Sequence, residues 1–201
     1  CYTPLRFWGG KSAAMAFSET GTDILAPGGG CDYPAIVSYQ NDFDGTNPIS
    51  KEYYDRFYKA INFCNTAIYH VKNVPFSDKA LTSKREAEVR FLRAYYYWIL
   101  VETFGDTYYT DQPSESIVMA PRKTSVSEIY THIFEDLDFC MDSRLSVAQS
   151  DGGRVTMWAA KALKARLLLT RASELNDKAL YEQAYTCLLY TSPSPRDPKT
   201  S

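Results

Sequence analysis

The sequence lacks long hydrophobic runs and an excess of charge of either sign. No stretch reaches the roughly 18 consecutive apolar residues that a membrane-spanning helix needs. Its 22 basic and 24 acidic residues nearly cancel, which leaves a net charge of −2. A protein that binds the phosphate backbone of a nucleic acid usually presents a strongly basic face. We therefore expect no nucleic-acid partner.

Metal-site and disulfide patterns are also missing. The five cysteines form an odd set without a Cys-x-x-Cys pair, so they predict neither a zinc site nor a disulfide framework. The two histidines, His70 and His132, do not have metal-ligand spacing. Cys64 and Cys140 lie at apolar helix positions, where a buried free thiol packs as a small hydrophobic group. We expect no metal ion and no cofactor.

Catalytic motifs are absent as well. There is no Gly-x-Ser-x-Gly motif, and Gly28-Gly29-Gly30 lacks the Lys-Ser/Thr pair that follows a phosphate-binding loop. Carboxylates two positions apart on a helix point in different directions. Glu86 and Glu88 are therefore a poor acid/base pair, and so are Asp136 and Asp138. We interpret these four side chains as solvated and expect that the protein is not an enzyme.

What the sequence does contain is helical periodicity. Apolar residues recur at spacings of three and four in five stretches, near 50–71, 79–104, 125–140, 156–170 and 177–188. Alternation with a period of two is nearly absent, so we predict an all-α architecture of antiparallel helix pairs. Residues 9–49 are rich in Gly, Pro, Asn and Asp and predict a loop-rich N-terminal segment.

Capping residues and apolar stripes refine these helices. We predict caps or stops at Ser50, Gly105, Ser125 with Glu128, Thr156 and Asp177. The buried face of the first long helix is predicted to be Tyr54, Phe57, Ile61, Cys64, Ile68 and Val71. That of the second is predicted to be Ala80, Ala87, Phe91, Ala94, Tyr95, Trp98 and Val101. The last helix is predicted to bury Tyr181, Ala184, Tyr185 and Leu188.

The two ends of the chain are interpreted separately. The sequence does not open with Met, and residues 1–8 read as part of a helix, so we expect the natural chain to start further upstream. Residues 190–201 hold three prolines and almost nothing apolar, and they cannot continue a helix. This string resembles translated sequencing adapter at the ends of metagenomic gene fragments. We expect residues 1–189 to be the protein itself and 190–201 a non-native tail.

Three stretches resemble the SusD/RagB family of outer-membrane nutrient-binding lipoproteins. Residues 54–68 resemble its W-x-x-x-Y-x-x-I-x-x-A-N-x-x-I helix, with Tyr54 in place of Trp. Residues 88–106 resemble E-x-x-F-L-R-A followed by F-G-D, although Thr107-Tyr108-Tyr109 departs from the usual Val-Pro-Leu. Residues 153–169 resemble G-R-V-T-x-x-A-A-x-A-L-L-A-R-V-Y-L. The resemblance extends from about residue 18 to residue 189.

The resemblance implies a SusD-like α-helical fold with tetratricopeptide-like helix pairs, of which 1–189 would be a partial N-terminal region. It implies non-catalytic binding of a polysaccharide or oligosaccharide at the surface of the outer membrane. It also implies delivery of that glycan to a TonB-dependent, SusC-like transporter. The membrane contact that it implies is an N-terminal lipid anchor, which we expect to lie outside the given sequence.

We expect the scaffold residues to lie on the helices and the ligand-binding residues to lie in loops. Arg90 and Arg93 are expected to hold carboxylates or helix ends, and Asn65 is expected to bond backbone. The family resemblance implies that loops make the ligand contacts, with aromatic rings stacked on sugar rings and polar groups hydrogen-bonded to hydroxyls. The loop before Ser50 resembles the family's variable ligand-facing segment by its position in the chain. The glycan-binding candidates are Tyr33, Tyr39, Asn41, Asp42, Phe43 and Trp8.

Two other functions stay open from the residues alone. Helix-pair repeats commonly present a concave face to peptides, so a protein-interaction scaffold is the main alternative. A helical glycoside hydrolase is a more distant one. The 16 tyrosines suit carbohydrate, because each ring offers a flat apolar face and a hydroxyl group, but they suit a helical core too. The family resemblance, the tyrosine-rich loops and the absence of a long charged groove favour glycan over peptide.

Overall fold

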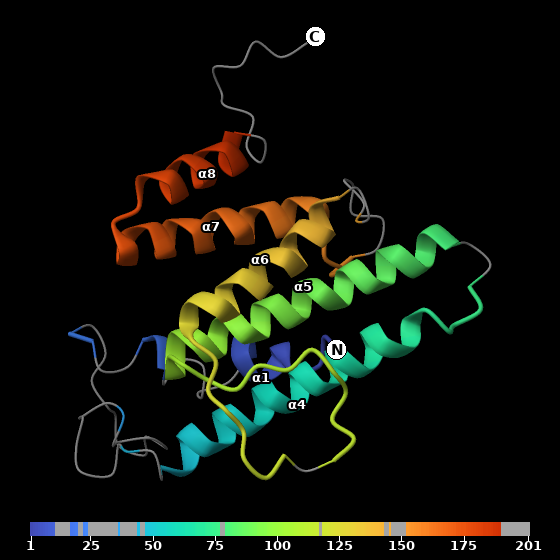
Figure 1. Ribbon diagram of the computed structural model, residues 1–201, viewed down its shortest axis with the longest axis horizontal. Helices are drawn as coiled ribbons and strands as arrows, with labels where there is room; N and C mark the ends of the chain where they lie inside the picture. The colour runs from blue at the N-terminus through green and yellow to red at the C-terminus, as the bar shows by residue number, and fades with distance from the viewer. Residues whose placement is uncertain are drawn as a thin grey trace. The chain divides into compact units, whose positions relative to one another are not determined.

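The computed structural model describes residues 1–10, 17–19, 22–23, 36, 44, 47–76, 79–116, 118–142, 145 and 152–189. This part of the chain contains no β-strand, only an isolated antiparallel bridge between Thr107 and Thr124. The all-α prediction is therefore confirmed. The helices are α1 (Leu5–Gly10), α4 (Pro48–Val71), α5 (Lys79–Phe104), α6 (Val126–Met141), α7 (Met157–Leu175) and α8 (Lys178–Leu189) (Figure 1).

Two predicted helix starts were wrong. Helix α4 begins at Pro48 rather than after Ser50, because the side chain of Asn47 accepts a hydrogen bond from the Ile49 amide (3.1 Å) and caps the helix. Proline suits the first helical position, where its missing amide hydrogen is not needed. At the chain start, residues 1–4 form turns, and the helix begins at Leu5.

The other predicted boundaries are confirmed. The Thr156 hydroxyl accepts from the Ala159 amide, and Ser125 accepts from Glu128, each at 3.3 Å. The Asp177 carboxylate accepts from the amide of Ala179 at 2.8 Å and starts α8. Helix α5 ends at Phe104, before Gly105, whose φ of +68° lies in the left-handed region that glycine adopts without strain.

The described chain divides into two compact units, and each is described by itself. Unit 1 consists of Cys1–Tyr69 and Tyr95–Ile129. Its centre is a cluster of aromatic rings in which α4 runs antiparallel to the last turns of α5. Phe57 contacts Tyr96 (5.9 Å between ring centroids), whereas Tyr53, earlier on α4, contacts Phe104, later on α5 (6.4 Å). This opposite order of contacts confirms an antiparallel pair.

The predicted buried face of α4 is off by one residue at its start. Tyr53 is fully buried, whereas Tyr54 is partly exposed. The buried side of α4 also includes Phe57, Ile61 and Cys64, as predicted. Because successive residues on a helix differ by about 100° in direction, Tyr54 points toward a different neighbour. Its ring contacts Phe104 of α5 (5.5 Å between centroids) and lines a hollow beside the loop between α5 and α6, which forms part of the candidate site.

The predicted single stripe of α5 is also incomplete. Phe91, Tyr95 and Trp98 are only partly buried, and Ala80 is exposed. Ala87, Ala94 and Val101 are buried as predicted. The buried positions also include neighbours on other sides of the helix, namely Leu92, Tyr96, Tyr97, Ile99 and Leu100. A helix covered on several sides has no single apolar stripe for the sequence to reveal.

Unit 2 consists of His70–Ala94 and Tyr130–Ser201. Within it, α6 runs antiparallel to the first part of α5, since Cys140 donates to the carbonyl of Ala87 (3.0 Å) while Asp136 binds Arg93 (2.7 Å). Helices α7 and α8 lie side by side (Figure 1), joined through Asn176 in the left-handed conformation. The predicted buried face of α8 is wrong, because only Ala184 is buried and Tyr181, Tyr185 and Leu188 are exposed.

A buried ionic network corrects the prediction that the carboxylates are solvated. Glu86, Glu88 and Asp136 are all buried. Glu86 binds Arg90, and Glu88 binds both Arg85 and Arg154, each at 2.8 Å. Asp136 binds Arg90 at 2.9 Å and Arg93 at 2.7 Å, which confirms the expectation for these two arginines. Buried charge is tolerated here because each carboxylate has at least one guanidinium partner.

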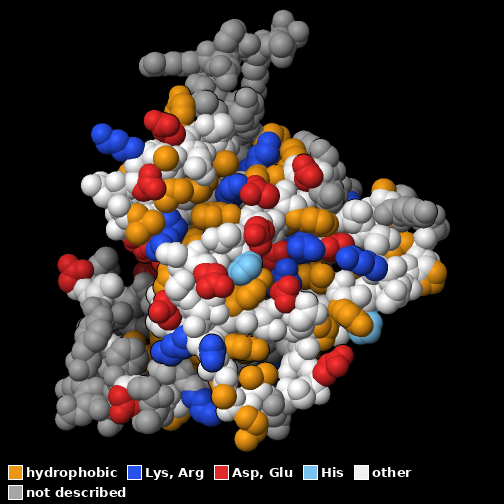
Figure 2. Space-filling model, in the orientation of Figure 1, with side chains coloured by type: hydrophobic (Ala, Val, Ile, Leu, Met, Phe, Trp, Pro, Cys, Tyr) orange, Lys and Arg blue, Asp and Glu red, His pale blue; other side chains and the backbone are white. Residues whose placement is uncertain are grey.

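The exposed surface carries charges of both signs. On the face drawn in Figure 2, acidic and basic side chains are interspersed rather than gathered by sign. None of the helices in the described ranges is long and apolar enough to cross a membrane. Among the same residues, no group of His, Cys, Asp and Glu side chains is arranged to hold a metal ion.

Candidate functional site

A shallow hollow of about 530 Å³ lies on unit 1, between the first half of α4 and the loop that joins α5 to α6. We call it the tyrosine hollow. Helix α4 contributes Tyr54 and Tyr58, one turn apart. The loop contributes an aromatic residue, hydroxyl groups, a carboxylate and apolar side chains, namely Tyr108, Ser114, Glu115, Ser116, Val118 and Pro121.

Three tyrosine rings form a row in this hollow. The rings of Tyr54 and Tyr58 lie 4.4 Å apart between centroids and are tilted by 39°. Tyr108 continues the row, stacked at 6.4 Å from Tyr58 with an angle of 29° between the planes. All three side chains are partly buried, so each ring is supported by its neighbours and still has exposed surface. At 4.4 Å the rings of Tyr54 and Tyr58 cover part of each other's faces, so the row presents to a ligand the ring surface that stays exposed and its hydroxyl edges.

The hydroxyl group of Tyr58 fixes the row to the loop. It donates to the backbone carbonyl of Tyr108 (2.5 Å) and lies 2.8 Å from the Thr107 hydroxyl. Because its one hydrogen is used on the carbonyl, the Thr107 hydroxyl must donate to it. Burial raises the pKa of the Tyr58 phenol well above its ordinary value, so this group stays protonated at every physiological pH.

Two asparagines of α4 hold the next part of the loop. The Asn65 side chain, which is 1% exposed, donates to the carbonyls of Thr110 (3.0 Å) and Gln112 (3.1 Å). One turn earlier, the side-chain oxygen of Asn62 accepts from the amide of Ser114 (2.8 Å). The expectation that Asn65 bonds backbone is confirmed, and its partners are loop carbonyls. In Figure 1 this loop, the yellow-green segment after α5, can be followed along α4.

The two ends of the loop are tied together. Thr107 and Thr124 exchange backbone hydrogen bonds of 3.2 and 2.8 Å. Beside them, the Asp106 carboxylate accepts from the amide of Val126 (2.9 Å) and caps α6. The Tyr97 hydroxyl donates to the Thr110 carbonyl (2.7 Å) and accepts from its amide (2.9 Å). A loop held at this many points presents its side chains in one arrangement.

We expect Asn65→Ala to lower the free energy of unfolding by about 1–3 kcal/mol, because it removes two hydrogen bonds from a buried side chain to the loop carbonyls of Thr110 and Gln112. Asn62→Ala is the matched control on the same helix. It removes a single bond to an exposed serine, and we expect a loss of about 1 kcal/mol or less. Urea denaturation followed by far-UV circular dichroism measures both. An Asn65→Ala protein as stable as the parent would contradict the anchoring role.

The chemistry of the tyrosine hollow suits a ligand with flat apolar faces edged by hydroxyl groups. The rings supply stacking surface that is desolvated at little cost. Ser114, Ser116 and Glu115 are exposed at the edge and supply hydrogen-bonding groups that orient a ligand. The lining holds one carboxylate, whereas glycoside hydrolysis ordinarily uses two.

Most of the residues predicted from the sequence to bind ligand fall elsewhere. Tyr33, Tyr39, Asn41, Asp42 and Phe43 lie outside the described residues. Trp8 lies on α1, partly buried, with its ring edge-on to Tyr53 (5.7 Å) and Phe57 (6.0 Å). The structure thus places Trp8 beside the aromatic cluster of unit 1 and does not bring it to the lining of the tyrosine hollow.

The three tyrosines of the hollow are not among the residues predicted to bind ligand. Tyr54 falls on the predicted buried face of α4, and the apolar spacing gives Tyr58 no role. Tyr108 lies where the sequence departs from the expected Val-Pro-Leu, and that departure was the available signal, since it places two tyrosines directly after a helix stop. Tyr54 and Tyr58 lie one turn apart on the same helix face, at the edge of the apolar stripe, which is the second signal.

The fold and the hollow together define a class: an all-helical protein whose helix pairs form a frame for a surface binding site. Comparison with known proteins identifies the family. A family model described as "Starch-binding associating with outer membrane" matches residues 31–169, which is more than half of the chain. The chain belongs to this SusD-like family.

Individual proteins that are similar to this chain are also SusD-like. The chain is 26% identical over 165 residues to a SusD-like protein of Bacteroides ovatus, covering 81% of this chain and 29% of the relative. It is 32% identical over 90 residues to the starch-binding protein SusD of Bacteroides thetaiotaomicron, covering 45% of this chain and 16% of that protein. A SusD superfamily protein of Parabacteroides distasonis has a similar structure, with a TM-score of 0.79 and 26% identity, over 94% of this chain and 42% of that one. The chain therefore spans less than half the length of each.

Proposed function

We propose that this protein binds a polysaccharide or oligosaccharide without cleaving it. The observation that carries the proposal is the row formed by Tyr54, Tyr58 and Tyr108, which is fixed to a well-anchored loop and edged by serines. Sugar rings present apolar C–H faces and equatorial hydroxyls, and this lining offers a counterpart to both. The starch-binding description of the family supports the same class of ligand.

The binding mechanism follows from the geometry of the row. A saccharide chain would lie against the exposed surface of the tyrosine rings, and Ser114, Ser116 and Glu115 would form hydrogen bonds with its hydroxyls. Because Asn62, Asn65 and Tyr58 already hold the loop, little conformational entropy is lost when ligand binds. We propose that the loop-rich segment adds contacts through the residues predicted there from the sequence, which are Tyr33, Tyr39, Asn41, Asp42 and Phe43. Trp8, the sixth predicted residue, lies on α1 and stays a prediction.

We propose in addition that the protein acts at the cell surface, as an outer-membrane lipoprotein that passes glycan to a TonB-dependent, SusC-like transporter. The family's description as associating with the outer membrane supports this location. Co-purification of the natural protein with such a transporter from solubilised outer membranes tests the partnership. Absence of the transporter from the purified complex would contradict it.

Tyr54→Ala and Tyr108→Ala are each expected to weaken the binding of maltoheptaose about tenfold, because each removes a stacking face. Tyr185→Ala is the control, since Tyr185 on α8 is 64% exposed and does not line the hollow. We expect it to bind as the parent does. Isothermal titration calorimetry measures all four proteins, and thermal denaturation checks that each is folded.

The same titration separates the alternatives. Tight binding of an extended peptide, together with indifference to every oligosaccharide in a panel of starch, laminarin and xyloglucan fragments, would favour a protein-interaction scaffold instead. Release of new reducing ends from any of these oligosaccharides would contradict the non-catalytic part of the proposal. The single carboxylate in the lining leads us to expect none.

A further inference from the structure

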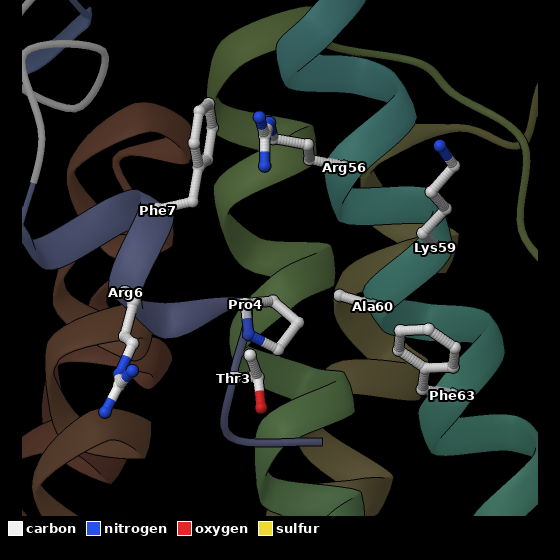
Figure 3. Close-up of a pocket in the computed structure, with 8 residues that line it drawn as sticks. All are labelled: Thr3, Pro4, Arg6, Phe7, Arg56, Lys59, Ala60 and Phe63. Atoms are coloured by element: carbon white, nitrogen blue, oxygen red, sulfur yellow. The ribbon is translucent and has the colours of Figure 1, made fainter.

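A second hollow of about 340 Å³ lies on unit 1, between α1 and a different face of α4 (Figure 3). We call it the cationic groove. Its floor is apolar and consists of Pro4, Phe7, Ala60 and Phe63. The Phe63 ring is 56% exposed, an unusual state for a phenylalanine in the middle of a long helix.

The edge of the cationic groove is basic. Arg6, Arg56 and Lys59 line it, and among the described residues of the lining there is no carboxylate. Arg56 is partly neutralised by Glu52 (2.6 Å) and lies over the Phe7 ring at 4.4 Å from its centroid. Within the described part of the chain, Arg6 and Lys59 have no ion-pair partner. Both side chains are exposed, so their charge is available to a ligand.

The three cations do not converge on one point. In Figure 3 the Arg6 side chain extends away from those of Arg56 and Lys59, with Pro4 between them. A compact anion such as phosphate could therefore not contact all three. A ligand that carries anionic groups at intervals along an otherwise ring-shaped, partly apolar chain could do so.

We propose that the cationic groove binds an acidic saccharide, a stretch of uronic acid residues, as a site separate from the tyrosine hollow. This inference rests on the proposed glycan binding and names the ligand class of a second site. Each uronate ring would bring one carboxylate for a basic side chain, and one of the rings would lay its C–H face on Phe63. The groove is independent of the tyrosine hollow because residues 56, 59 and 63 project from the side of α4 opposite to residues 54 and 58.

The test uses the 201-residue chain and two probes that differ only in charge: tetragalacturonate and its fully methyl-esterified form. We expect tetragalacturonate to bind more tightly and to lose affinity as salt is raised from 50 to 500 mM. The double substitution Arg6→Gln with Lys59→Gln should weaken tetragalacturonate binding about fivefold and leave maltoheptaose binding unchanged. Lys123→Gln, an exposed lysine outside the groove, is the control and should change neither.

Each outcome bears on one proposal or both. Equal affinity for the acid and the ester, or no effect of the double substitution, would overturn the acidic-saccharide site. If maltoheptaose bound at the same time, glycan binding at the tyrosine hollow would stand. If neither charged nor neutral saccharide bound, both proposals would fail. Because the substituted side chains are exposed, loss of folding is not expected, and an unchanged melting temperature confirms that.

Discussion

Replacing Asp136 by alanine is expected to lower the free energy of unfolding by about 3–5 kcal/mol. The Asp136 carboxylate on α6 accepts from Arg93 Nε and Nη2, each at 2.7 Å, and from Arg90 Nη1 at 2.9 Å. Arg93 is itself buried, so the substitution leaves a guanidinium away from water without this counter-charge. The loss is mainly the cost of that uncompensated charge, and urea denaturation measures it.

Asp138→Ala is the matched control for Asp136→Ala. Asp138 lies two residues further on the same helix and binds Lys164, but its side chain is 55% exposed. An exposed pair contributes little, so we expect a loss of about 1 kcal/mol or less. The double substitution Asp136→Leu with Arg93→Met should recover much of the stability lost in Asp136→Ala, because neither charge then remains unpaired. Equal losses for the two single aspartate substitutions would contradict the buried network.

These two aspartates show a limit of sequence interpretation. Asp136 and Asp138 had been treated alike, as solvated carboxylates, and only the second is exposed. A carboxylate carries no burial signal of its own, because its state depends on whether an arginine from another helix reaches it. A signal did exist on the partner side, since Arg93 stands between Leu92 and Ala94 in a helix with a largely apolar second half.

The helices themselves could be predicted because their signals are local. Apolar spacing and caps such as Thr156 and Asp177 act within one or two turns of the chain. The error at Ser50 has a local cause too. Asn47 and Ser50 are both good capping residues, and Pro48 decides between them because proline favours the first helical position.

The candidate site was harder to predict because it is assembled from distant segments. Tyr58 on α4 and Tyr108 in the α5–α6 loop are 50 positions apart, and only the packing of the loop on α4 brings them together. Sequence periodicity can say that Tyr54 lies near the edge of an apolar stripe. It cannot say that a loop covers this edge and turns it into a hollow. The residues predicted in the segment before Ser50 stay a proposal.

Phe57→Ala is expected to lower the free energy of unfolding by about 3–5 kcal/mol. Phe57 is 1% exposed, and its ring contacts those of Phe7 (6.4 Å), Tyr53 (4.9 Å) and Tyr96 (5.9 Å). The surrounding rings belong to α1, α4 and α5, so they are held by three helices and cannot close the space that alanine would leave. The loss therefore combines the transfer of the ring with the cost of a cavity.

Phe63→Ala is the matched control for Phe57→Ala, because the same residue type is removed six positions later on α4. Phe63 is largely exposed at the cationic groove, so we expect its removal to change stability by about 0.5 kcal/mol or less. Thermal and urea denaturation of the two variants compare a core ring with a surface ring in one helix. Equal destabilisation would mean that Phe63 is covered in solution, which would also remove the floor from the proposed acidic-saccharide site. A large difference would leave that floor free for a ligand, as the proposal requires.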